Sequence, residues 1–98
     1  MTTEHVLKTL PEYWDAVKRG EKTFEVRRDD RGFQRGDTVE LVRLDRYANG
    51  ALLESHQRLR FTIGWILTGG QFGIEPGYCV MGLSDSYEFR APAGADVE

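Results

Sequence analysis

The feature that most constrains the fold of this chain is a strict alternation of apolar and other side chains in its second half. Every second position of this run is apolar: Leu59, Phe61, Ile63, Trp65 and Leu67. Successive side chains of a β-strand point to opposite faces, so a period of two predicts a strand with one face in the core. We expect Trp65, mid-way along this face, to be buried more deeply than Trp14, which can be partly solvated on a helix.

Three further segments have the character of strands, and they predict a curled sheet. They are residues 5–8, 38–47 and 78–83. The apolar parity of the second segment changes near Leu41 and Val42, which indicates a β-bulge of the kind that bends barrel strands. The pair Asn49-Gly50 then predicts a hairpin with a type I′ turn into the long strand.

One amphipathic helix is expected near the N-terminus. Three apolar residues fall on one helical face: Leu10, Trp14 and Val17. Thr9 and Glu12 have the spacing of a capping box, and Gly20 is placed to end the helix. The helix should therefore span about ten residues, 10–19, with Trp14 as its anchor in the core.

A short alternating strand at residues 23–28 carries the best candidate site. In this strand Phe24 and Val26 should point to the core, and the opposite face then carries Thr23, Glu25 and Arg27. A carboxylate beside a guanidinium, with Lys22 at the strand mouth, offers an acceptor and fixed donors to a ligand with polar edges or a phosphate. The alternative is a solvated sheet face that carries a cross-strand ion pair.

The loop after this strand is a candidate rim for the same site. Residues 18–35 hold seven of the thirteen basic residues and four acidic ones, which makes the segment locally cationic. Loops on rigid scaffolds often carry binding groups, so Asp30 and Arg31 are candidate ligand-binding residues. The alternative is a solvated loop held by a contact of Asp30 with Arg31 or with the backbone.

Length and composition limit the class of protein. A chain of 98 residues that is 40% hydrophobic can bury one small core. We expect a single domain over residues 1–89 and a disordered tail over 90–98, where there is nothing to bury. One cysteine, Cys79, cannot form an internal disulfide, and we expect it to be a core thiol. With two histidines it makes no zinc-spaced cluster, so we expect neither a metal nor a cofactor.

Charge and hydropathy narrow the setting and the partners. The chain has no long apolar run and no signal pattern at its N-terminus, so a cytoplasmic protein without membrane insertion is expected. Its formal net charge of −3 argues against a general coat for nucleic acid, because nonspecific binding draws mainly on cationic contacts to phosphate. Any role with nucleic acid must therefore be local.

Several short motifs occur together in a recognisable order. They are His5-x-Leu7-Lys8, Gly20-x-Lys22-Thr23-Phe24-Glu25-x-Arg27, Asp30-Arg31-x-Phe33-x-x-Gly36-Asp37, Gly69-Gly70-Gln71-Phe72-Gly73 and Gly77-Tyr78-x-Val80. Over residues 5–83 the chain resembles a small ASCH-like family with a PUA-like fold. The resemblance implies an α+β fold, a mixed β-barrel of about five to seven strands with the N-terminal helix packed against one opening.

The resemblance also implies a function, because this superfamily is thought to bind RNA or modified nucleosides. The expected partner is RNA or a nucleotide-like ligand in a polar cleft around Lys22, Glu25 and Arg27. The candidate ligand-binding residues are Lys8, Lys22, Glu25, Arg27, Asp30 and Arg31.

A small hydrolase acting on a modified nucleoside or on RNA is the alternative function. The ASCH superfamily includes an amidohydrolase for acetylated cytidine, in which a lysine matching Lys22 is followed three positions later by a catalytic threonine. This chain has Glu25 at that position. Lys22 and Glu25 are the catalytic candidates if the protein is an enzyme, and a protein-interaction adaptor is a third possibility.

Overall fold

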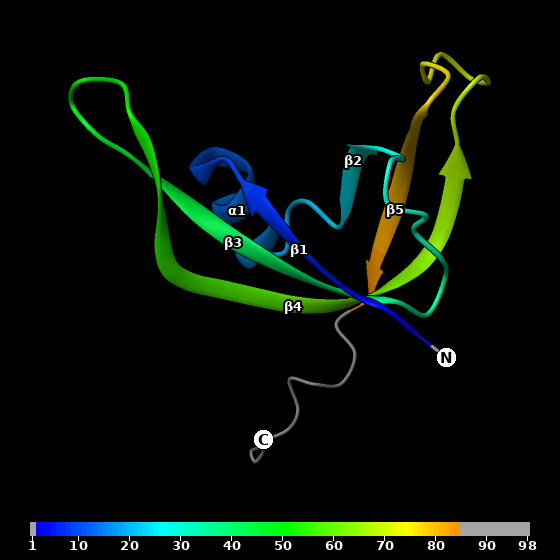
Figure 1. The fold of residues 1–98 in the computed structure, drawn as a ribbon, viewed down its shortest axis with the longest axis horizontal. Helices are drawn as coiled ribbons and strands as arrows, with labels where there is room; N and C mark the ends of the chain where they lie inside the picture. Colours follow the sequence, from blue (N-terminus) through cyan, green and yellow to red (C-terminus); the bar gives the residue numbers. More distant parts are fainter. Residues whose placement is uncertain (1, 85–98) are drawn as a thin grey trace.

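The computed structural model describes residues 2–84 as one curved sheet of five strands with one short helix (Figure 1). In chain order the elements are β1 (Glu4–Thr9), α1 (Pro11–Lys18), β2 (Phe24–Arg28), β3 (Thr38–Arg46), β4 (Leu52–Thr68) and β5 (Tyr78–Ser84). The sheet forms a half-barrel, so the prediction of a small, mixed α+β fold is confirmed. The domain end placed at residue 89 and the tail at 90–98 lie outside the described residues.

The order of the strands in the sheet is β1-β3-β4-β5-β2, which puts the first two strands of the chain at opposite edges. β1 runs parallel to β3, and the other neighbours are antiparallel. The long strand β4 pairs with β3 along its first part and with β5 along its last part, and it bends between them (Figure 1). Within residues 2–84 no backbone ladder joins β1 to β2, so the barrel stays open along this seam.

Two β-bulges bend the sheet. The register of β3 shifts between Val42 and Leu44, close to the predicted position. A second shift lies in β4 between Ile63 and Ile66, and it reverses the parity of the apolar run. Ile63 is buried before the bulge and Ile66 packs against the core after it, whereas Trp65 between them is 68% exposed. The prediction that Trp65 is a deeply buried core residue is therefore wrong.

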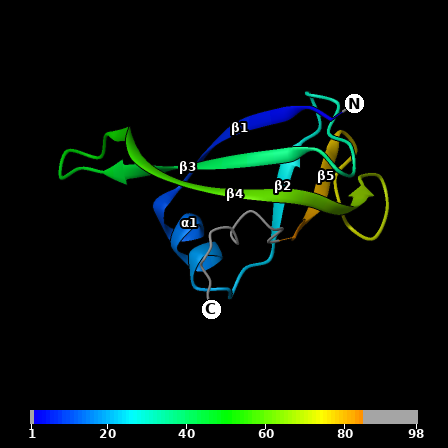
Figure 2. The ribbon, with the colours of Figure 1, turned by 90° about the horizontal axis from the view of Figure 1, so that it is seen from below.

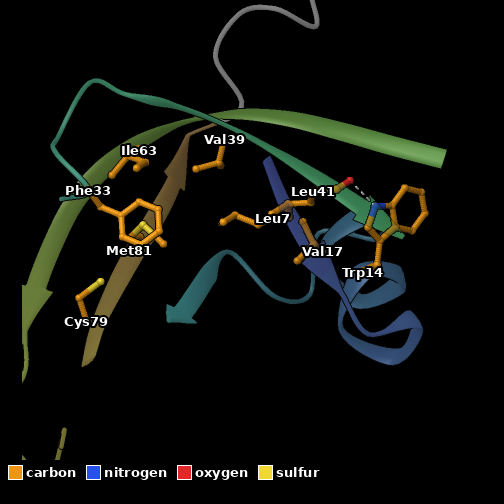
Figure 3. Close-up of a cluster of buried hydrophobic side chains, with 9 residues drawn as sticks. All are labelled: Leu7, Trp14, Val17, Phe33, Val39, Leu41, Ile63, Cys79 and Met81. Carbon is orange, nitrogen blue, oxygen red and sulfur yellow. Dashed lines mark hydrogen bonds between the residues drawn. The ribbon is translucent and has the colours of Figure 1, made fainter. Parts of the chain in front are cut away.

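The core lies on the concave side of the sheet, where the strands meet α1 and the loop between β2 and β3. Its buried residues are Leu7, Trp14, Val17, Phe33, Val39, Leu41, Ile63, Cys79 and Met81 (Figure 3). Cys79 is fully buried, so the prediction of a core thiol is confirmed, and burial together with the charge of Asp29 raises the pKa of this thiol. Phe33 inserts from the loop and fixes that loop to the core.

The helix α1 is anchored as predicted. Trp14 is 3% exposed, and its indole Nε1 donates to the Leu41 carbonyl at 2.9 Å (Figure 3). At the C-terminal end Gly20 has a φ of +82°, and the Glu21 amide donates to the Ala16 carbonyl at 3.0 Å. A left-handed glycine with this backbone bond is the usual end of a helix, so the predicted stop is confirmed. The helix α1 has eight residues, and within residues 2–84 no helix is long and apolar enough to cross a membrane.

The start of α1 departs from the prediction. The N-cap is Leu10, which makes no side-chain capping bond, and Thr9 is the last residue of β1. The Thr9 hydroxyl donates to the Leu7 carbonyl and accepts from Arg27. The predicted capping box is wrong because the strand extends up to the helix and takes the capping residue. Pro11 at the first helical position has no N–H to satisfy, which lowers the need for a cap.

The hairpin between β3 and β4 forms where it was predicted, and it projects past the helix (Figure 2). Its turn type differs from the prediction, because a type I′ turn needs positive φ at both central residues. Of the pair Asn49-Gly50 only Gly50 has a positive φ, +89°.

The two faces of β2 are the reverse of the prediction. In the ladder with β5, Glu25 pairs with Met81 and Arg27 pairs with Cys79. Met81 and Cys79 are fully buried, and residues paired across a ladder share a face, so Glu25 and Arg27 lie on the concave side. Phe24 and Val26 are 42% and 50% exposed on the convex side. The alternation was read correctly, but it was assigned to the wrong faces.

Candidate functional site

A cleft of about 500 Å³ lies between the end of β1, the start of α1 and β2. It is lined by Lys8, Thr9, Leu10, Tyr13, Lys22, Phe24, Glu25, Val26 and Arg27. Most of the predicted ligand-binding residues therefore lie together: Lys8, Lys22, Glu25 and Arg27. The other two, Asp30 and Arg31, are exposed in the following loop and do not line the cleft.

The Glu25 carboxylate is the centre of the cleft. It is 3% exposed, and each of its oxygens faces a cation. Oε2 accepts from Lys22 Nζ at 2.7 Å, and Oε1 accepts from Arg27 Nε at 3.0 Å. Burial of a carboxylate is unfavourable unless its oxygens are paired and hydrogen-bonded, and this condition is met here. The two cations therefore hold the carboxylate in one orientation at the cleft surface.

Two aromatic rings flank the Lys22 ammonium. Its Nζ lies 4.9 Å from the centroid of the Phe24 ring and 5.6 Å from that of Tyr13. It also donates to the Phe24 carbonyl at 2.6 Å. These distances allow cation–π attraction, which adds to the ion pair with Glu25. The lysine is thus held rigidly between an aromatic wall and a carboxylate.

Arg27 bridges the open seam of the half-barrel. Its Nη2 donates to the Lys8 carbonyl at 3.0 Å and to the Thr9 hydroxyl at 3.2 Å, both on the free edge of β1. Arg31 reaches the same edge, because its Nη1 donates to the Val6 carbonyl at 2.9 Å. Unpaired carbonyls on an edge strand need partners, and the two guanidinium groups supply them. Arg31 thus braces the wall beside the cleft.

Spare donors remain for a ligand. An ammonium group has three N–H bonds, and Lys22 uses two of them on Glu25 and Phe24. In residues 2–84 no hydrogen-bond partner of the Arg27 Nη1 group is found, so its two N–H bonds are open. The cleft combines a fixed acceptor with at least two donor groups and two aromatic rings.

Most of the chain matches a family model. The match covers residues 4–83 and is to DUF3850, a domain of unknown function. The chain belongs to the DUF3850 family. A search of curated proteins finds no match. The cleft and every helix and strand, except the last residue of β5, fall within the matched range, so the site belongs to the DUF3850 domain itself.

The DUF3850 domain has a second buried polar group, away from the cleft, at the start of β1. His5 Nε2 lies 2.8 Å from Asp37 Oδ2, and the amides of Thr3 and Gln34 donate to the same carboxylate at 3.0 Å. Burial opposes ionisation of Asp37, but these hydrogen bonds outweigh it and lower its pKa. The carboxylate is fully engaged within the fold and holds the β2–β3 loop against β1. Within the described chain no set of three acidic, histidine or cysteine residues is arranged to hold a metal.

Sequence reasoning missed five residues of the cleft: Thr9, Leu10, Tyr13, Phe24 and Val26, of which the last two were assigned to the core. A usable signal existed for two of them, because Leu10 and Tyr13 are three residues apart at the helix start and neighbours on its surface. Thr9 was assigned to the helix cap, which obscured its place on β1. No pattern in the sequence indicates that the end of β1 faces β2, since that proximity depends on the curvature of the sheet.

Proposed function

We propose that the cleft binds RNA or a nucleotide-like ligand through Lys22, Glu25 and Arg27. The observation that carries the proposal is a buried carboxylate held between two cations beside aromatic walls. Such a carboxylate accepts from the exocyclic amino group or ring N–H of a base, while the cations bind phosphate or a carbonyl edge. The rings of Tyr13 and Phe24 offer apolar surface to a planar base.

The size of the cleft and the likeness of its motifs to the ASCH-like family support the same ligand class. A volume near 500 Å³ falls within the range of about 300–1,000 Å³ that is typical of small-ligand pockets. The volume is therefore sufficient for a ligand of nucleotide size. The net charge of the chain is negative, so binding would depend on the local donors of the cleft.

The hydrolase alternative has less support. A nucleophile needs an adjacent general base that is free to take its proton. In the described part of the cleft, the Thr9 hydroxyl donates to the Leu7 carbonyl, and both oxygens of Glu25 accept from cations. This arrangement favours recognition of a ligand over attack on it.

The test is a binding titration of short homopolymeric RNAs of each base, and of the free nucleosides, at low and high salt. Arg27→Ala should weaken all RNA ligands alike, by about 1–3 kcal/mol, because it removes a charged donor. Glu25→Gln should change the preferred base more than the overall affinity, since it alters the acceptor that reads the base. Higher salt should reduce only the part of the affinity that the RNAs share.

Arg58→Ala is the matched control, because Arg58 is exposed, pairs with Glu40 and lies outside the cleft. It should bind as the wild type does. Thermal unfolding of each variant separates loss of binding from loss of fold. If the wild-type protein binds none of the ligands, or if the cleft variants bind them as the wild type does, the proposal is wrong. Turnover of a nucleoside that is lost in Lys22→Ala would instead support the hydrolase.

A further inference from the structure

The convex face of the β2–β5–β4 part of the sheet carries exposed apolar side chains. Val26, Val80 and Leu67 face one another across the three strands, and Phe24 pairs with Gly82 in the next row. Trp65 joins this surface because the bulge turns it away from the core. We call this surface the outer face, and it comprises Phe24, Val26, Trp65, Leu67, Tyr78 and Val80. Three of its residues are well exposed: Phe24, Val26 and Trp65.

Each aromatic ring of the outer face has a cation stacked on it. The Arg28 guanidinium lies 5.0 Å from the centroid of the Tyr78 ring and donates to the Tyr78 hydroxyl at 3.1 Å. The Arg35 guanidinium lies 5.4 Å from the centroid of the Trp65 ring. Lys22 stacks on Phe24 at the boundary with the cleft. The outer face therefore carries two arginine–aromatic pairs, Arg28 with Tyr78 and Arg35 with Trp65.

In the part of the chain that the structure describes, no carboxylate lies within ion-pair distance of Arg28 or Arg35. The arginines of β3 and β4 differ in this respect, since all of them pair with acidic side chains: Arg43, Arg46, Arg58 and Arg60. Arg28 and Arg35 therefore place positive charge that has no ion-pair partner within residues 2–84 beside the exposed aromatic residues.

This combination fits an anionic chain that carries planar groups. Single-stranded nucleic acid is held by aromatic side chains on which bases stack, by arginine planes and by cations that meet the phosphates. The outer face supplies each of these elements with Trp65, Phe24, Arg28 and Arg35. An apolar protein partner would cover the valines and leucine, but it would leave the unpaired arginines without counter-charge.

We propose that the outer face binds the single-stranded RNA that flanks a nucleotide held in the cleft. Phe24 lines the cleft and also lies on the outer face, so the two surfaces are continuous. The part of the proposal that joins them rests on the proposed function of the cleft. The stacking of RNA on Trp65 is independent of that function, because Trp65 lies outside the cleft.

The test compares a single nucleotide with single-stranded RNAs of increasing length. Trp65→Ala should weaken binding of the longer RNAs between about 5-fold and 150-fold, the range expected for loss of one base–aromatic stack. It should leave binding of the single nucleotide unchanged. Tyr47→Ala is the matched control, because Tyr47 is 51% exposed on the distant β3–β4 hairpin. Arg28→Gln should also weaken the longer RNAs, and Arg58→Gln should not.

A second readout uses the exposure of Trp65 directly. Trp14 is buried and Trp65 is exposed, so a soluble quencher such as iodide should reduce mainly the fluorescence of Trp65. Bound RNA should protect Trp65 from iodide. Trp65→Ala and Arg28→Gln both change exposed side chains, so these variants should unfold at nearly the wild-type temperature.

The outcomes separate the two proposals. Trp65-dependent binding of longer RNAs without binding of the single nucleotide would support the outer face and contradict the role of the cleft. Binding of all RNAs that is unchanged in Trp65→Ala and Arg28→Gln would overturn the outer-face proposal while leaving the cleft in place. No binding of RNA, together with self-association that Trp65→Ala abolishes, would assign the face to contact between copies of the chain and would also overturn the proposal.

Discussion

Truncation of the two tryptophans should have very different effects on stability, because one is buried and the other is not. Trp14→Ala removes a side chain that is 3% exposed and deletes the bond to the Leu41 carbonyl. Removal of a large aromatic side chain from a core lowers the free energy of unfolding by about 3–5 kcal/mol. Trp65→Ala removes a side chain that is 68% exposed and one stacked arginine, so the loss should stay below about 1 kcal/mol.

The assays are urea unfolding and thermal unfolding at neutral pH, both followed by far-ultraviolet circular dichroism, which does not depend on tryptophan fluorescence. For a domain of this size each kcal/mol lowers Tm by about 4–8 °C, so Trp14→Ala should melt about 12 °C or more below the wild type. Trp14→Phe keeps most of the apolar ring and should be intermediate, because it loses the indole N–H. Equal losses for Trp14→Ala and Trp65→Ala would refute the burial assigned to the two side chains and the bulge that causes it.

Three further predictions concern the rest of the fold. The pKa of Asp37 is lowered in the fold, so its stabilising contribution is complete above the ordinary value of 3.8 and is lost as pH falls through the lower folded value. The difference in unfolding free energy between the wild type and Asp37→Asn should therefore shrink as pH falls below about 4 in urea titrations, and a constant difference would contradict this account. Gly69→Ala should destabilise the fold by about 1–3 kcal/mol or more, because the new Cβ would clash with the carbonyl oxygen of Glu75. Gly64→Ala should cost less, because its nearest contact would be at 3.6 Å, and equal losses in thermal unfolding would contradict this account. Cys79 should react with thiol reagents only slowly until urea unfolds the protein, because burial shields the thiol and raises its pKa, and fast labelling of the native protein would show that β5 is not held in the core.

Much of the local structure could be predicted because it depends on neighbouring residues. The stop at Gly20 follows from a left-handed backbone that glycine adopts easily, and the helix face of Trp14 follows from helical spacing. The bulge near Val42 was visible as a change of apolar parity. These features need only a few consecutive residues and their side chains.

The set of cleft residues was also partly predictable. Glu25 and Arg27 were grouped because residues two apart on a strand share a face, and Lys22 was added at the strand mouth; the structure keeps all three together. Their real environment was not predictable, because the carboxylate is buried rather than solvated. Only contacts with α1 and with the edge of β1, distant in sequence, turn an exposed charged face into a closed ion-paired cleft.

The sequence by itself determined which side chains alternate, where the helix stops and which charged residues are neighbours. It did not determine which face of a strand is inside, because a period of two defines a pair of faces and not their orientation. That choice came from tertiary pairing: the ladder with Met81 and Cys79 turned Glu25 inward, and one bulge in β4 turned Trp65 outward. A carboxylate can be buried when both of its oxygens have charged partners, and Lys22 and Arg27 supply them to Glu25, while Phe24 and Val26 remain at the surface.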